Sequence, residues 1–286
     1  MDKKLKKLIE ENLGETVNSF SGVGGGSIAD SSIIETVSGK RYFLKTGFNG
    51  TMFFNEANGL KELRKPGCIK IPDVIAVDNQ FLLLELITPG PRQKDFWTVF
   101  GRQYAQMHKF TAKTFGFYED NYIGATPQKN LPSEKEKNSW TEFYFNKRLL
   151  FQYRLAEQNG YATSELKRAF NAIELKIDEI LKGSEEPPAL LHGDLWSGNY
   201  ITGPKGEPVL IDPAVYYGHR EADLGMTYLF GGFSEQFYNT YNEAYPLKKG
   251  WEYRVNIYKL YHVLNHLNLF GTGYYSQAVR LMEYYI

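Results

Sequence analysis

The sequence predicts an α+β fold of two lobes: a small antiparallel sheet with one helix, followed by a mainly helical lobe. Short apolar runs separated by turn residues fill the first 87 of the 286 residues, as is typical of short strands. Pro89-Gly90-Pro91 then interrupts the pattern. After this break, apolar residues recur mostly at helical spacing. We therefore predict a first lobe over residues 1–87 and a second lobe over residues 88–286.

The first lobe is expected to begin with a helix, because the apolar residues from Leu5 to Leu13 follow helical spacing. Residues 15–47 fit a meander of three strands, in which alternating apolar residues are separated by turns. A helix fits residues 51–64, where the apolar side chains form one stripe. Two further strands fit residues 71–87. The lobe is thus predicted to contain a helix, three strands, a second helix and two strands.

The second lobe is expected to be mainly helical. The expected helices cover residues 94–111, 138–158, 162–182, 220–230, 234–245, 250–270 and 274–285. Strand character is expected in residues 189–212 alone, with a turn at Gly203-Pro204-Lys205-Gly206. The helical lobe should therefore carry one strand-rich segment.

Composition excludes several classes of function. Lys and Arg number 33 and so do Asp and Glu, and this zero net charge gives no reason to expect a nucleic-acid partner. No window approaches the roughly 20 apolar residues of a membrane span. Cys68 is the single cysteine, which suits a reducing cytoplasm, and the N-terminal residues lack the apolar core of a signal peptide. We expect a cytoplasmic protein of undetermined oligomeric state.

Three polar residues in the strand-rich segment indicate phosphoryl transfer. Asp194 precedes Asn199 by five residues, and Asp212 follows the apolar run Val209-Leu210-Ile211. Transfer from ATP needs a carboxylate that accepts the proton of the attacking hydroxyl, and an amide and a second carboxylate that hold Mg²⁺. We assign Asp194 as the base and Asn199 and Asp212 as the metal ligands. An isolated Asp would more often cap a turn, but the three together favour the chemistry.

Lys45 lies in an apolar strand, where lysine is unusual unless it is paired. Glu56 lies on the following helix, and an ion pair between them would hold the ammonium against ATP phosphates. The alternative is that both side chains point to solvent at the edge of the sheet.

Other segments of the first lobe offer backbone contacts to a nucleotide. The glycine-rich segment Gly24, Gly25, Gly26 and Ser27 lies between two predicted strands, where its N–H groups could cover phosphates, although such runs are commonly flexible turns. Glu85 and Ile87 end the last strand, where backbone groups could pair with the adenine edge.

His219 and Glu221 are candidates for a polar wall beside the acceptor. Equally, Glu221 could simply be an acid in the first turn of a helix, which the helix dipole favours. His262 and His266 have the i, i+4 spacing of a zinc motif, but without further ligands they are expected to be interior histidines.

The combined motifs resemble the fructosamine kinase (ketosamine 3-kinase) family. This family lies in the protein-kinase-like superfold, which also contains aminoglycoside phosphotransferases. The resemblance covers essentially the whole chain. It is most specific in Leu190–Asn199 (LLHGDLWSGN) and Ile211–Glu221 (IDPAVYYGHRE), with support from Gly124–Gln128 (GATPQ) and Leu264–Asn268 (LNHLN).

The resemblance implies transfer of the ATP γ-phosphate to the 3-hydroxyl of a ketoamine, with Mg²⁺ as cofactor. The acceptor would be a fructosamine, ribulosamine or erythrulosamine, as a small molecule or on glycated lysine, and the role would be deglycation. Trp196 would contact the sugar, since an indole suits its apolar face. Two alternatives are a kinase for another small hydroxyl compound, such as an aminoglycoside or aminoalcohol, and a nucleotide-binding scaffold without catalysis.

Overall fold

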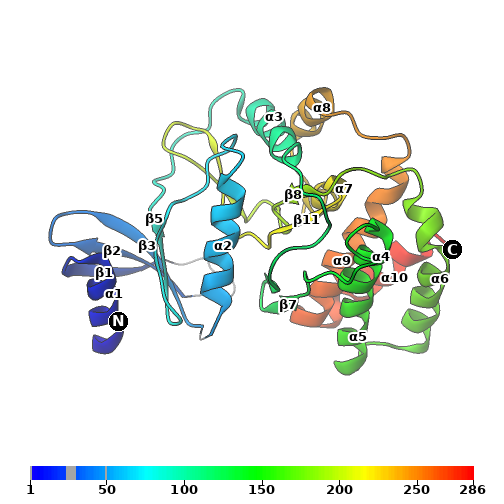
Figure 1. Ribbon diagram of the computed structural model, residues 1–286, viewed down its shortest axis with the longest axis horizontal. Coiled ribbons are helices and arrows are strands. Elements are labelled where there is room, and N and C mark those ends of the chain that lie inside the picture. Colours follow the sequence, from blue (N-terminus) through cyan, green and yellow to red (C-terminus); the bar gives the residue numbers. More distant parts are fainter. Residues whose placement is uncertain (1, 24–29, 49) are drawn as a thin grey trace.

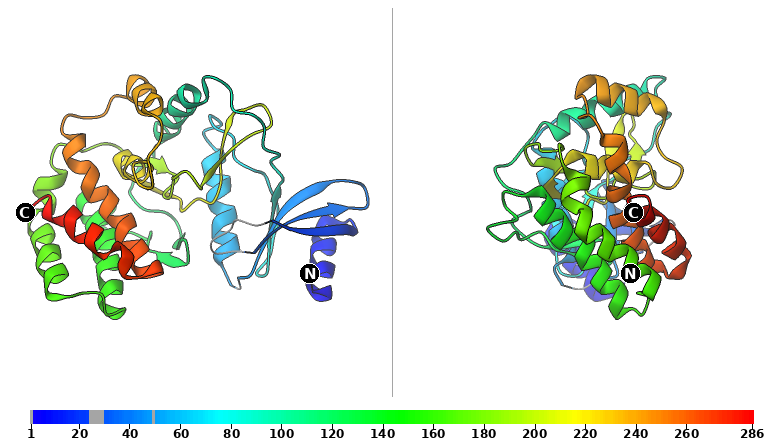
Figure 2. Two further views of the ribbon diagram at one scale, coloured as in Figure 1. Left: turned by 180° about the vertical axis from the view of Figure 1, so that it is seen from behind. Right: turned by 90° about the vertical axis from the view of Figure 1, so that its right-hand side faces the viewer.

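The structure is a computed structural model that describes residues 2–23, 30–48 and 50–286. It shows a small lobe built around a sheet beside a larger helical lobe, which confirms the predicted α+β class (Figure 1). The N-terminus lies on the small lobe and the C-terminus on the large lobe (Figure 2).

The small lobe contains one five-stranded antiparallel sheet with a helix on each face. Its elements in chain order are α1 (Lys3–Leu13), β1 (Val17–Val23), β2 (Asp30–Thr36), β3 (Arg41–Thr46), α2 (Met52–Arg64), β4 (Val74–Val77) and β5 (Leu82–Glu85), and the strand order is β1-β2-β3-β5-β4. Strand β5 alternates between two cores: Leu83 packs with Ile9 of α1, whereas Leu82 and Leu84 belong to the core that includes Phe53 of α2. Strand β5 is therefore buried on both faces of the sheet.

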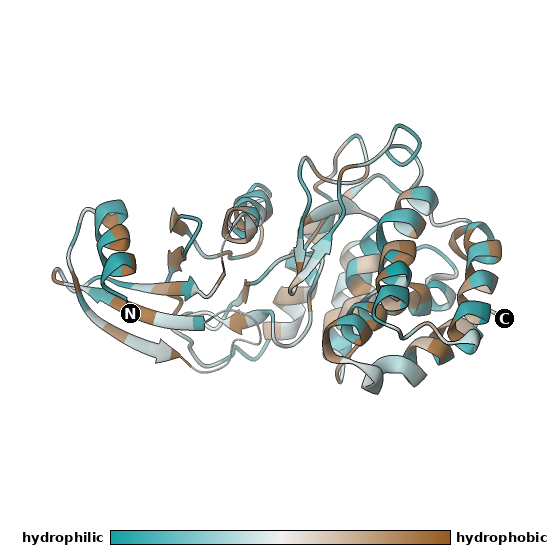
Figure 3. Ribbon diagram, turned by 90° about the horizontal axis from the view of Figure 1, so that it is seen from below, coloured by the Kyte–Doolittle hydropathy of each residue, from teal (hydrophilic) through white to brown (hydrophobic). Residues whose placement is uncertain are grey.

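The large lobe is mainly helical, as predicted. Its elements are α3 (Phe96–His108), β6 (Asn121–Ile123), β7 (Thr126–Gln128), α4 (Trp140–Tyr144), the π-helical turn η1 (Phe145–Leu150), α5 (Phe151–Gln158), α6 (Ser164–Leu181), β8 (Ala189–Leu191), β9 (Tyr200–Thr202), β10 (Pro208–Leu210), β11 (Tyr216–Gly218), α7 (Arg220–Thr227), α8 (Glu235–Ala244), α9 (Trp251–Phe270), the 3₁₀ turn η2 (Thr272–Tyr274) and α10 (Tyr275–Glu283). Figure 3 shows hydrophobic and hydrophilic residues in alternating bands along these helices, the pattern that the sequence prediction used.

Three short strands of the large lobe were not predicted, and the expectation that only residues 189–212 would form strands was wrong. β6 and β7 pair with each other, and β11 pairs with β8. Each of these strands has three residues, too few for an alternating pattern to be recognised. β9 and β10 form the expected hairpin around the turn at residues 203–206.

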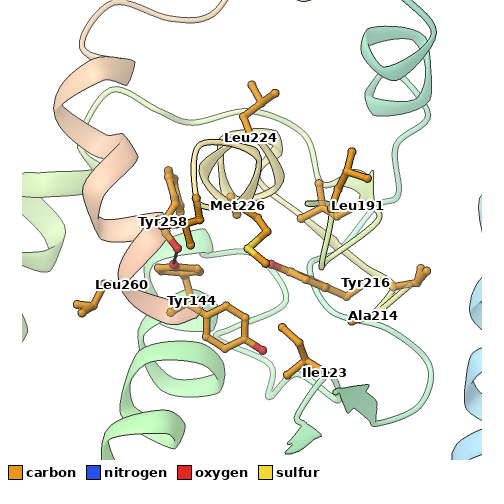
Figure 4. Packing of buried hydrophobic residues seen from close by; sticks show 14 of the residues in the cluster. Ile123, Tyr144, Leu191, Ala214, Tyr216, Leu224, Met226, Tyr258 and Leu260 are labelled. Carbon is orange, nitrogen blue, oxygen red and sulfur yellow. Dashed lines mark hydrogen bonds between the residues drawn. The ribbon is translucent and has the colours of Figure 1, made fainter. Parts of the chain in front are cut away.

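The core of the large lobe fixes the segments that carry the candidate site. Tyr216 of β11, Met226 of α7 and Tyr258 of α9 are at most 2% exposed and pack into one cluster with Tyr144 of α4 (Figure 4). This core also contains Leu191 of β8, three residues before Asp194. The loop that carries Asp194 therefore starts from a rigid position.

The core does not separate cleanly at the predicted lobe boundary. Residues of α2 and β5 share one hydrophobic cluster with the helices of the large lobe. The backbone of the connector also meets the β9–β10 hairpin, since Gly90 N donates to Gly203 O at 3.2 Å. The division at residues 87 and 88 stays a prediction.

Candidate active site

A cavity of about 400 Å³ is lined by residues of both lobes. Lys45 of β3 and Glu56 of α2 line it from the small lobe, and Asp194, Asn199 and Asp212 from the large lobe. With Trp196, the tertiary structure thus brings together six of the candidate residues, which lie up to 167 positions apart in the chain.

The loop that presents Asp194 is held by its backbone. Asp223, at the start of α7, accepts hydrogen bonds from His192 N and from Gly193 N, both at 2.7 Å. Gly193 has φ +83°, and a Cβ atom there would lie 1.9 Å from Ala214 O. Glycine is therefore required both for its backbone conformation and for the close approach of the segment at Ala214.

Asp194 and Asn199 interact directly within this loop. Asn199 Nδ2 donates to Asp194 O at 2.7 Å and to Asp194 Oδ2 at 3.1 Å. The amide nitrogen is thus committed to Asp194, and the amide oxygen is left as the atom that could bind a cation. Burial raises the pKa of Asp194 well above its usual range, with Asp212 and Asp223 adding to the rise and the Asn199 hydrogen bond opposing it. A cation or a hydrogen-bond donor nearby would favour the ionised form.

Asp212 follows β10 in the left-handed backbone region, with φ +54°. The unpredicted β6–β7 hairpin supports the chain just beyond it. Gln128 Nε2 donates to Ala214 O at 2.9 Å, and Asn121 Nδ2 donates to Val215 O at 2.8 Å. These buried amides hold the backbone at Ala214 and Val215, two and three residues after Asp212.

Lys45 joins the two lobes by ion pairs. Its Nζ lies 2.7 Å from Glu56 Oε1 and 2.6 Å from Asp212 Oδ1. Burial alone would lower the pKa of Lys45, but the charges of Asp212 and Glu56 outweigh burial and raise it. Burial raises the pKa of Glu56, and Lys45 opposes that rise. Lys45 is therefore a charged, buried ammonium placed beside the candidate metal ligands.

The donor set fits Mg²⁺ bound together with phosphate. Asn199 and Asp212 offer an amide oxygen and a carboxylate to the same cavity. In the described ranges, no group of three or more His, Cys, Asp or Glu side chains could hold a metal by itself. Magnesium commonly takes one or two carboxylates and completes its shell with phosphate oxygens and water, so these two residues suit it.

Aromatic side chains form the far side of the cavity. We call this surface the aromatic wall; it consists of Trp196, Phe230, His266, Phe270 and Tyr274. The ring centroids of Trp196 and Phe230 are 5.7 Å apart, and those of Phe230 and His266 are 4.9 Å apart. Trp196 was singled out by the family resemblance. His266 was considered only as an interior histidine, and no role was assigned to Phe230, Phe270 or Tyr274 from the sequence.

Two predicted acceptor residues do not reach this cavity. His219 is fully buried, and its Nε2 interacts with Ser184 O while its Nδ1 accepts from Glu221 N at the start of α7. Glu221 is 4% exposed and forms a two-point ion pair with Arg254 at 2.6 and 2.7 Å. The predicted polar wall at His219 and Glu221 is therefore wrong for this structure, because buried partners from distant segments hold both side chains.

The other residues predicted to bind the nucleotide either do not line the cavity or lie outside the described residues. The Glu85 carboxylate pairs with Lys70 at 2.6 Å, and Glu85 N donates to Asp73 O at 2.8 Å. Ile87 is buried at the end of the same segment. Gly24, Gly25, Gly26 and Ser27 lie outside the described residues.

Sequence reasoning missed Asp223 as the anchor of the loop and the amides of Asn121 and Gln128. Asp223 lies in the first turn of α7, where the helix dipole alone favours an acid, so its position in the sequence carries no signal of this role. Its partners His192 and Gly193 are some 30 residues earlier in the chain, so spacing could not reveal them.

Replacing the buried ammonium gives a first prediction. Lys45→Met should raise the KM for ATP or lower kcat, so that kcat/KM falls about 10- to 100-fold. This is the range for losing a hydrogen bond to a charged group. Steady-state kinetics with varied ATP measures this effect. The exposed Lys182, which ends α6, offers a control, since Lys182→Met should leave kcat/KM unchanged. An unaltered kcat/KM for Lys45→Met would exclude a phosphate contact.

The fold and this cleft define a kinase-like phosphotransferase. The structure of the ADP-bound aminoglycoside phosphotransferase APH(2'')-Ib aligns with a TM-score of 0.65 at 13% identity, covering 99% of this chain and 98% of that chain. At this identity the likeness shows the fold alone.

Within that class, the chain belongs to the fructosamine kinase family, whose model matches residues 1–286. A chloroplastic protein-ribulosamine 3-kinase of Oryza sativa subsp. indica is 38% identical over 288 residues, covering 98% of this chain and 82% of the relative. The crystal structure of a candidate fructosamine-3-kinase from Thermobifida fusca aligns with a TM-score of 0.88 at 32% identity, covering 100% of this chain and 99% of that chain. The family resemblance recognised from the motifs is thereby confirmed.

No helix within the described part of the chain is long and apolar enough to cross a membrane.

Proposed function

We propose that the protein transfers the γ-phosphate of ATP to the 3-hydroxyl of a ketoamine. The observation that carries this proposal is the convergence of Lys45, Asp194, Asn199 and Asp212 on one cavity that also has an aromatic wall. The polar side of the cavity suits a triphosphate, and the aromatic side suits a sugar derivative. The family of the chain and the name of its rice relative agree with this acceptor class.

Asp194 acts on the acceptor. Its carboxylate orients the 3-hydroxyl and accepts the proton late in transfer, as the bond from the hydroxyl oxygen to the γ-phosphorus forms. The bond between the γ-phosphorus and the β–γ bridging oxygen breaks, and ADP leaves. Asn199 keeps Asp194 in place through its two hydrogen bonds.

The remaining polar groups act on the nucleotide. Asn199 and Asp212 would hold Mg²⁺, which screens the negative charge of the phosphates. Lys45 is held ready by Glu56 and contacts the α- and β-phosphates. The adenine edge pairs with backbone atoms at Glu85 and Ile87. Because Glu85 N already bonds Asp73 O, the adenine contacts use other backbone atoms there.

The acceptor lies against the aromatic wall, with Trp196 on the apolar face of the sugar. The amine substituent is a small molecule or a lysine side chain. Enolisation towards C1 gives an enaminol in which the phosphate at C3 is an allylic leaving group, so the phosphorylated adduct expels phosphate and becomes an imine at C1. Water then hydrolyses this imine and releases the amine. The protein therefore acts in deglycation. Its proposed location is the cytoplasm.

A panel of acceptors tests the proposal. The protein is incubated with ATP, Mg²⁺ and ribulosyl-, erythrulosyl- or fructosyl-lysine, and NMR locates the new phosphate. Phosphate on the C3 oxygen of at least one ketoamine is the expected result. Turnover of an aminoglycoside without any ketoamine would replace the proposed acceptor, and tight ATP binding without turnover of any acceptor would indicate a scaffold.

A further inference from the structure

His262 lies in the middle of α9 beside the candidate base, and the proposed mechanism does not use it. It is 3% exposed. Its Nδ1 is buried and has no hydrogen-bond partner in the part of the chain that the structure describes. Asp194 Oδ1 lies 4.0 Å from this nitrogen. A polar atom buried without a partner costs stability, so its presence calls for a physical reason.

The imidazole of His262 is neutral in this environment. Burial lowers its pKa to about 3, with His266 and Arg148 adding to the effect and Asp223 opposing it. A neutral imidazole has one N–H donor and one acceptor nitrogen. With the proton on Nδ1, the ring offers a donor in the direction of Asp194 without placing a second charge in the cleft.

The carboxylate of Asp194 is complementary to that donor. Oδ2 already accepts a hydrogen bond from Asn199, at 3.1 Å. Oδ1 faces His262, and 4.0 Å is about 1 Å longer than a hydrogen bond. Catalytic hydrogen bonds are often long without substrates and shorten when the reacting complex forms.

We propose that His262 is a positioning residue for the candidate base, and that its Nδ1–H donates to Asp194 Oδ1 when ATP and the acceptor are bound. The carboxylate would then be held at both oxygens, by Asn199 from its own loop and by His262 from α9. The remaining lone pair of Oδ1 points to the acceptor hydroxyl. This inference rests on the proposed function, since it assigns a partner to the proposed base.

A shared metal site with His266 does not explain the unpaired nitrogen. His266 Nδ1 donates to the His262 carbonyl at 2.7 Å, so this nitrogen is already committed to the backbone of the same helix. Across the described ranges, no set of three metal-binding side chains includes the two histidines. Packing alone does not explain the histidine either, because an apolar residue of similar size would fill the same space without burying an unpaired nitrogen, which lowers stability.

Two variants test whether His262 positions Asp194 or only fills space in the core. His262→Leu removes the donor and keeps much of the volume, whereas His262→Asn keeps an N–H donor near the position of Nδ1. We expect His262→Leu to lower kcat about 10- to 100-fold, the range for one hydrogen bond to a charged group, with little change in the KM for ATP. His262→Asn should recover most of that loss. The Tm of His262→Leu should be equal to or above that of the wild type, since an unpaired polar atom has been removed.

A double-mutant cycle provides the decisive readout. In the Asp194→Asn background, His262→Leu should cause no further loss in single-turnover rate, because the base that His262 would position can no longer accept the proton. The control is Val263→Ala on the same helix, which is 1% exposed and outside the cavity lining; it should lower Tm while kcat is kept.

Three results would overturn the inference. The first is a wild-type kcat in His262→Leu, and the second is an equal loss of kcat in His262→Leu and His262→Asn. The third is a further loss of single-turnover rate when His262→Leu is added to Asp194→Asn. Full activity of Asp194→Asn would instead contradict the proposed function itself, so the two failures can be distinguished.

Discussion

Asp194→Asn lowers kcat for the ketoamine by about 10²- to 10⁴-fold while the Kd of ATP stays nearly unchanged, which is the first of the two largest effects that we expect. General bases contribute rate enhancements of this size. Asparagine keeps the shape of the side chain but cannot accept the proton of the acceptor hydroxyl. The loop should keep its position, because Asp223 holds it through the backbone of His192 and Gly193.

Rapid-quench measurement of phosphoryl transfer and calorimetric titration of ATP test this pair of outcomes. Asp178→Asn provides a control, because Asp178 is exposed on α6 and does not line the cavity. It should match the wild type in both measurements. Parallel losses in ATP affinity and turnover for Asp194→Asn would assign Asp194 to nucleotide binding instead.

Asp223→Ala should lower the free energy of unfolding by about 2–5 kcal/mol and should also lower kcat. The substitution leaves two buried backbone N–H groups, on His192 and Gly193, without their acceptor, and each such group costs about 1–3 kcal/mol. His108 and Tyr104 lose the same partner. The loop that carries Asp194 would lose its anchor, so activity falls although Asp223 does not line the cavity.

The stabilisation by Asp223 should depend on pH. Burial alone would raise the pKa of Asp223, but the hydrogen bonds from His108 and Tyr104 and the neighbouring His192 outweigh burial and lower it. A carboxyl whose pKa is lower in the folded protein stabilises the fold above its unfolded pKa of about 3.9, and this stabilisation is lost as pH falls through the folded pKa. The stability difference between the wild type and Asp223→Asn should thus be full near neutral pH and shrink below about pH 4.

Urea denaturation across this pH range measures that difference. An unchanged midpoint for Asp223→Ala near neutral pH would show that the loop does not depend on its anchor. Asp120→Ala offers a comparison at a partly exposed site: Asp120 accepts from two backbone N–H groups but lies near the surface, so water can replace it at lower cost.

The elements that the sequence predicted well are those whose signal is local and long. The long helices α3, α6 and α9 have 13, 18 and 20 residues, so their apolar residues recur at helical spacing often enough to be recognised. The strands β6, β7 and β11 escaped prediction because three residues carry no readable period. Yet β6 and β7 support the chain beyond Asp212, so a short element without a sequence signal contributes to the geometry of the site.

The sequence alone determined which chemical groups this protein can bring to a reaction. Asp194 and Asn199 share one loop because they are five residues apart, and Asp212 ends a strand because an apolar run precedes it. The tertiary structure alone decided which of these groups meet and in what environment. It placed Lys45 against Asp212, gave Asp194 its anchor in Asp223 and its neighbour in His262, and buried Glu221 against Arg254. The physical reason is that spacing along a chain fixes only near neighbours, whereas burial, charge and hydrogen bonding depend on every group that the fold brings within a few ångströms.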